Sequence, residues 1–180
     1  MGYRIAISVF LVALGGVSAC NLFFRYPIAV PADPLGDKDS LASMAIARAV
    51  ISHRDIPDFS LLSTTPAIIV ESECEFVTLA GDTLTDSITV HSLPHDRSVN
   101  FALLTPAQIQ KEADDHSDFV YLSVFRIRMS AQGAFVSVAT TWAVGKDSRV
   151  VILSGGGYVL RFSKDGGSWM FEEVVAEWIS

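Results

Sequence analysis

The sequence predicts an α+β fold in which one or two helices pack on a curled antiparallel sheet, preceded by a signal peptide. Apolar residues recur at helical spacing in the first half of the chain, and the period changes to two from Phe119 onward. Helices that precede a long run of strands are typical of the α+β class. With 180 residues, 50% of them hydrophobic and 18% charged, the chain has the length of one domain and is too apolar to be disordered.

Residues 1–19 have the three-part shape of a secretory signal peptide. Arg4 supplies the positive charge, an apolar run from Ile5 to Leu14 follows, and small residues lead up to Cys20. About 20 apolar residues are needed to cross the core of a bilayer. Because this stretch is shorter, we expect a cleaved leader rather than a membrane span.

The end of the leader, Val17-Ser18-Ala19-Cys20, resembles the lipobox of bacterial lipoproteins. The resemblance implies that cleavage follows residue 19 and that Cys20 carries a diacylglycerol and further acyl chains, which anchor the domain to a membrane. Asn21 is not the Asp that resembles an inner-membrane retention signal, so an outer membrane is favoured where the cell has two. The alternative is ordinary leader cleavage near Ala19, with Cys20 unmodified.

Residues 20–38 are predicted to form a tether, and residues 39–180 a single domain. The tether is broken by residues that disfavour helix and central strand, namely Pro27, Pro31, Pro34 and Gly36. The domain then opens with a helix that begins near Asp39 or Ser40, either of which can cap it, and ends at Pro57. The apolar face of this helix is Leu41, Ala42, Ala45, Ile46, Ala49 and Val50.

Residues 66–70 are predicted to form a short buried strand that continues into an acidic segment. Alternation along a strand places Glu71, Glu73 and Glu75 on one face and Cys74 on the other. We expect Cys74 to be buried, with its pKa raised by the neighbouring carboxylates, so that it is a poor nucleophile.

A second helix is predicted from Pro106 to about His116. Thr105 and Gln108 have the spacing of a capping box, and Pro106 occupies the first helical position. A narrow stripe of Ala107, Ile109 and Ala113 is expected to face the core.

Period-two segments and turn residues then predict a meander of antiparallel strands over residues 125–129, 135–144, 149–153, 158–163 and 169–178. Ser154-Gly155-Gly156-Gly157 joins two of these strands, whereas a phosphate-binding loop leads from a strand into a helix. We therefore expect a bulge, a bend or a close approach of another backbone there.

The order of these elements, with closing segments such as Tyr158-Val159-Leu160-Arg161-Phe162 and Val174-Val175-Ala176-Glu177-Trp178, resembles the nuclear-transport-factor-two-like and cystatin-like α+β rolls. The resemblance implies a bent sheet that wraps a helix and leaves a conical pocket. Tyr121, Trp142 and His116 are the candidate lining residues of such a pocket. The segment from Phe59 to Asn100 departs from the family, because it holds strand-like stretches where a further helix is usual.

Two clusters of polar residues raise the question of metal or acid–base chemistry. His91 and His95 lie four residues apart, with Asp58 and Asp96 as possible carboxylates, but Pro94 argues against the helix that such a zinc pair usually needs. Residues 114–118 pack three carboxylates around His116 without the order of ligands in a calcium loop. Solvated surface positions explain both clusters, so we predict no metal site.

Composition narrows the function further. A net charge of −7 with scattered basic residues disfavours nucleic-acid binding, and two cysteines are too few for a four-cysteine zinc site or a disulfide scaffold. No catalytic set can be assigned, and no cofactor is predicted. The sequence therefore favours a lipid-anchored protein of the bacterial envelope acting as a non-enzymatic binding or interaction module, with an envelope protein or a small ligand as partner. The alternative is a small-ligand carrier or enzyme that uses the conical pocket.

Overall fold

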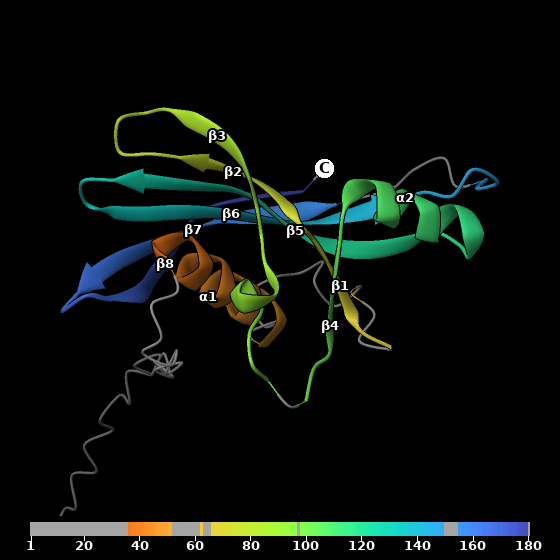
Figure 1. Ribbon diagram of the computed structural model, residues 1–180, viewed down its shortest axis with the longest axis horizontal. Helices are drawn as coiled ribbons and strands as arrows, with labels where there is room; N and C mark the ends of the chain where they lie inside the picture. The colour runs from red at the N-terminus through yellow and green to blue at the C-terminus, as the bar shows by residue number, and fades with distance from the viewer. Residues whose placement is uncertain (1–35, 52–61, 63–65, 97, 150–154, 180) are drawn as a thin grey trace, which may run out of the picture.

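The computed structural model describes residues 36–51, 62, 66–96, 98–149 and 155–179. Within these ranges, two α-helices pack on an eight-stranded, curled, mostly antiparallel sheet, which confirms the predicted α+β class (Figure 1). The predicted leader and almost all of the tether lie outside the described residues. The elements are α1 (Asp37–Ile51), β1 (Ile68–Glu71), β2 (Glu73–Val77), β3 (Thr83–Ser87), the 3₁₀ turn η3 (Val90–Ser92), β4 (Phe101–Leu104), α2 (Pro106–Asp115), β5 (Phe119–Ser130), β6 (Gly133–Ala143), β7 (Gly156–Asp165) and β8 (Ser168–Ile179).

The C-terminal meander forms as the two-residue period predicts. Strands β5, β6, β7 and β8 are neighbours in that order, and each pairs antiparallel with the next. Gly166 and Gly167 both have positive φ, 56° and 90°, and form the two-residue turn between β7 and β8. Of the strand predicted over 149–153, Arg149 lies in no strand, and residues 150–154 fall outside the described ranges.

The sheet is mixed, because parallel pairs join the predicted antiparallel meander. Strand β1 pairs parallel with β4 and, at Val70↔Leu122, with β5, while β2 pairs parallel with the other half of β5. A bend at Ser72 separates β1 from β2, and the Ser72 N–H bonds to the Leu104 carbonyl at 2.9 Å. Parallel neighbours come from distant segments of the chain, so the period of one strand does not reveal them.

Helix α1 lies across one face of the sheet and fills its curl (Figure 1). The predicted apolar stripe is confirmed, because all six of its residues are buried: Leu41, Ala42, Ala45, Ile46, Ala49 and Val50. The helix begins at Asp37, two residues before the predicted cap. Its start is fixed by partners in the sheet: Asp37 accepts hydrogen bonds from Lys164 Nζ and Trp169 Nε1, and Lys38 Nζ donates to the Ser87 carbonyl at 2.8 Å.

Helix α2 packs against the opposite face of the sheet, far from the turns of the three hairpins (Figure 1). The predicted capping box is present, since Thr105 Oγ1 accepts from the Gln108 N–H and Gln108 Oε1 accepts from the Thr105 N–H. Ile109 and Ala113 are buried as expected, but Ala107 is exposed, which corrects the predicted stripe. The helix is only ten residues long, and only Ile109 and Ala113 of it are buried.

Gly157 on β7 is a point of close approach between strands. A Cβ atom there would lie 2.4 Å from Trp178 Cζ2 and 2.5 Å from the Val138 carbonyl oxygen. The Trp178 ring in turn meets the edge of Phe125, with ring centroids 5.7 Å apart. The close approach expected for the glycine run is therefore confirmed. The Trp178 ring packs on the face of the sheet opposite α1, which we call the outer face.

Replacing Gly157 by alanine is expected to lower the free energy of unfolding by about 1–3 kcal/mol, because the methyl group overlaps both the indole and a backbone carbonyl. Gly36→Ala is the matched control, since no atom lies within 4 Å of the position that its methyl group would take. Urea denaturation of both variants measures the difference. Equal midpoints for the two would contradict this close packing.

Candidate functional site

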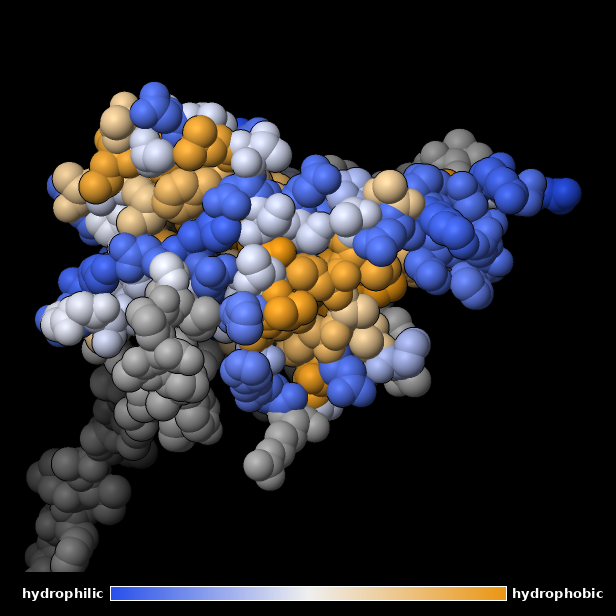
Figure 2. Space-filling view, viewed as in Figure 1, coloured by the Kyte–Doolittle hydropathy of each residue, from blue (hydrophilic) through white to orange (hydrophobic). Residues whose placement is uncertain are grey.

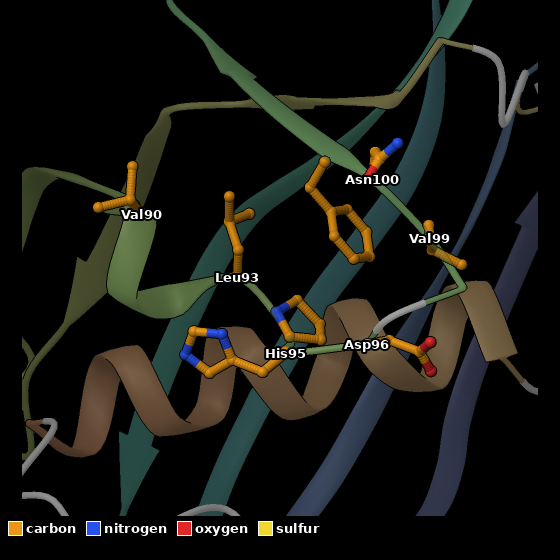
Figure 3. A pocket seen from close by; sticks show the side chains of 8 residues that line it. Val90, Leu93, His95, Asp96, Val99 and Asn100 are labelled. Carbon is orange, nitrogen blue, oxygen red and sulfur yellow. The ribbon is translucent and has the colours of Figure 1, made fainter.

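An open pocket of about 480 Å³ lies beside β4, where the chain passes from η3 into that strand (Figure 3). Its walls are mainly apolar, and its lining residues are Val90, Leu93, Pro94, His95, Asp96, Val99, Asn100 and Phe101. Figure 2 shows the same region as a continuous hydrophobic area on the molecular surface, next to the hydrophilic surface of α2. We call these eight residues the η3–β4 pocket.

The floor of the η3–β4 pocket is the edge of the protein core. Leu93, Val99 and Phe101 are half-buried and pack against the main hydrophobic cluster around α1. Val90, in contrast, exposes 64% of its surface at the rim. The apolar side chains of the pocket therefore rest on the packed core rather than on an isolated loop.

A polar network holds this segment against the start of α1. The Thr89 N–H donates to Ser92 Oγ at 3.1 Å, and the fully buried Ser92 hydroxyl donates to the Asp39 carboxylate. Thr89 Oγ1 also accepts a hydrogen bond from the His91 N–H, which caps η3. The network satisfies the buried hydroxyl and fixes where Val90 and Leu93 stand.

The polar side chains of the η3–β4 pocket do not form an acid–base pair. The imidazole of His95 and the carboxylate of Asp96 point in different directions along the segment (Figure 3). Asp96 Oδ1 accepts from both the backbone N–H and the hydroxyl of Ser98, at 2.7 and 2.5 Å, and these bonds lower the pKa of Asp96. Asp96 thus stabilises its own turn.

The three residues predicted to line a conical pocket are not brought together. Tyr121 pairs with Thr141 and Trp142 pairs with Val120, so Tyr121 and Trp142 lie on opposite faces of the sheet. Tyr121 packs in the small cluster beneath α2, and burial followed by the charge of Glu71 raises its pKa. Trp142 packs on the main core, and His116 is an exposed C-cap of α2.

The acidic residues around His116 attach α2 to the turn after β6. Asp114 Oδ1 accepts from the Lys146 N–H, and Asp118 Oδ1 accepts from the Gly145 N–H, both at 2.8 Å. Lys111 pairs with Asp115 one turn along the helix. Within the described part of the chain, no group of three metal-ligating side chains gathers, here or at His91 and His95, while Asp58 lies outside it.

Cys74 is buried on the core side of β2, as predicted. Glu71 and Glu75 lie toward the outer face, where Ser123 donates to Glu71 and Arg126 pairs with Glu75 at 2.6 Å. Burial is the main reason that the pKa of the Cys74 thiol rises to about 11; Asp86 and Asp39 add to the shift and Lys38 opposes it. The predicted direction is right, but the predicted cause, the charge of Glu73 and Glu75, is wrong.

The sequence interpretation missed the apolar residues of the η3–β4 pocket, because it considered only the histidines in that segment. The signal that could have found them is the density of apolar side chains within a stretch rich in turn residues: Val90, Leu93, Pro94, Val99 and Phe101. Apolar residues in such a turn are either buried in the core or exposed on the surface. The sequence alone does not show which, because burial depends on the packing of distant segments.

Comparisons with known proteins add no functional assignment. No family model matches the chain, and no curated protein and no solved structure matches it either. Among the residues that the structure describes, no helix has both the length and the hydrophobicity to cross a membrane.

The raised pKa of Cys74 predicts a loss of stability at alkaline pH. The thiol ionises near its ordinary value of 9.0 in the unfolded chain and near 11 in the folded one. Between these values the unfolded state binds fewer protons, so the free energy of unfolding falls as pH rises, by up to about 1.4 kcal/mol per unit.

Cys74→Ala is expected to abolish this component of the pH dependence. The measurement is urea denaturation at pH 8, 9, 10 and 11, with both proteins carrying Cys20→Ser so that Cys74 is the only thiol. Parallel stability curves for the two proteins over this range would contradict a buried, neutral thiol.

Proposed function

We propose that the chain is a lipid-anchored protein of the bacterial cell envelope whose domain acts as a non-enzymatic binding or interaction module. The observation that carries the interaction role is the η3–β4 pocket, with Val90 64% exposed above a floor of half-buried apolar residues. Contiguous apolar surface on a soluble domain favours contact with a partner. The lipobox Val17-Ser18-Ala19-Cys20 supports the anchor.

The chemistry of the pocket supports binding rather than catalysis. A general acid or base must reach the proton it transfers, yet His95 and Asp96 diverge, and Asp96 is occupied by Ser98. A few polar groups at the rim of an apolar surface serve to orient a bound group. The alternative of a carrier or enzyme with a conical pocket has less support, because core side chains of α1 and the sheet fill the space between them.

The proposed tether determines where the module works. The predicted tether spans residues 20–38, and because α1 begins at Asp37, residues 20–36 remain, which reach at most about 60 Å when fully extended. Several acyl chains on Cys20 hold the protein at the membrane durably, whereas one chain would not. The domain can therefore meet partners in the membrane or beyond it, with the outer membrane favoured in a cell that has two. An envelope protein or a small apolar ligand fits the η3–β4 pocket.

The lipid anchor is tested by replacing each cysteine in turn. With a clickable palmitate analogue in growing bacteria, wild type and Cys74→Ser are expected to label, and Cys20→Ser is expected to lose its label and leave the membrane fraction. Both variants remove one thiol, so only the position differs. Labelling of Cys20→Ser at the wild-type level would show that Cys20 is not lipidated.

The binding surface is tested by placing a photo-crosslinking amino acid at Val90 in cells. We expect a discrete adduct at Val90 and none at Lys111, which is exposed on the hydrophilic surface of α2. Adding Leu93→Asp to the Val90 probe should abolish the adduct, because it places a charge in the apolar pocket. Adducts of equal yield at Val90 and Lys111 would contradict the proposal. So would the absence of an adduct at Val90 when membranes from the irradiated cells are solubilised and analysed.

A further inference from the structure

Strand β8 presents an open edge in the part of the sheet that the structure describes. It is the last strand on one side of the sheet and pairs with β7 along Gly156–Asp165. No strand among the described residues pairs with its other side. The strand is 12 residues long, so a long row of backbone donors and acceptors faces outward, which is the usual template for an added strand.

Strand β8 has only some of the devices that protect a sheet edge. It carries glutamates and bulges, but it is long and contains no lysine and no proline. It exposes three large apolar side chains, with Met170 43%, Val174 37% and Val175 42% exposed. Strand β3, at the opposite edge, has only five residues. Bulges at Glu172 and Val175 bend β8 without covering its outer backbone groups.

The charge on β8 is uniformly negative. Glu172, Glu173 and Glu177 are exposed, and the strand has no cationic side chain. Arg161 on β7 contacts both Glu172 and Glu173, at 3.0 and 3.2 Å. One guanidinium therefore serves two carboxylates, and the edge keeps a net negative charge.

This charge disfavours a second copy of the chain as the added strand. Two copies paired along β8 would bring together the three glutamates of each strand, with only one Arg161 guanidinium per copy to offset them. Like charges close together across a strand pair are destabilising, and each copy carries a net charge of −7. Lysine or arginine at the same positions would instead make favourable cross-strand pairs.

We infer that the outer edge of β8 binds an extended segment of a partner protein that contains both apolar residues and lysine or arginine. Backbone hydrogen bonds to the edge would supply affinity. The exposed valines and glutamates would select the sequence, since side chains of an added strand lie beside those of β8 on each face. This inference does not depend on the lipid anchor or on the η3–β4 pocket.

The test uses the full chain in mild detergent and two synthetic peptides, one of alternating valine and lysine and one of alternating valine and glutamate. Amide hydrogen exchange, read by mass spectrometry, is expected to slow across residues 168–179 with the lysine peptide and to remain unchanged with the glutamate peptide. Protection confined to any other segment, or equal protection by both peptides, would overturn the inference.

A charge reversal on the edge provides the matched variant. Glu177→Lys is expected to weaken binding of the lysine peptide by about fivefold, because an attractive cross-strand pair becomes repulsive. Glu73→Lys on β2 makes the same change away from β8 and should leave binding unchanged. If residues 168–179 become protected without peptide as the chain self-associates, the occupant is a second copy, and the inference is wrong.

Discussion

The burial of α1 in the curl of the sheet organises both the hydrophobic core and the η3–β4 pocket. Its small residues let the helix backbone approach β5 and β6, and Leu41 and Ile46 are fully buried between them. Burying each such side chain contributes about 1.5–3 kcal/mol. The start of the helix is also held by polar contacts to strands at both ends of the sheet. Asp37 contacts β7 and β8, and Lys38 contacts β3. The η3–β4 pocket rests on the same helix through Ser92 and Asp39.

Most polar residues that first suggest chemistry hold the fold together instead. Asp114 and Asp118 accept backbone N–H groups from the turn after β6 and so dock α2. Asp96 closes its own turn, and Cys74 is a neutral core residue. The surfaces proposed for other molecules are the apolar η3–β4 pocket and the acidic edge of β8.

The two proposed surfaces would recognise different features of a partner. The η3–β4 pocket presents side chains on the core and suits an apolar group with a small polar part. The edge of β8 presents mainly backbone groups and a row of glutamates, and it suits an extended basic segment. Because the two surfaces belong to different parts of one sheet, the domain can use either without rearranging its core.

Local sequence signals were enough to predict the Thr105 and Gln108 capping box, the apolar face of α1, and the period-two strands from β5 to β8. These signals lie in residues that are close in the sequence, so they can be recognised without knowledge of the fold. Three features depend on long-range packing: β1 and β2 pair parallel with β5, α2 packs on the face opposite α1, and Tyr121 and Trp142 lie on opposite faces. The η3–β4 pocket also depends on long-range contacts, because the parallel pairing of β1 with β4 sets the direction in which the segment crosses the core. Long-range pairing is decided by the fit of distant surfaces and by loop closure, which local periodicity does not encode.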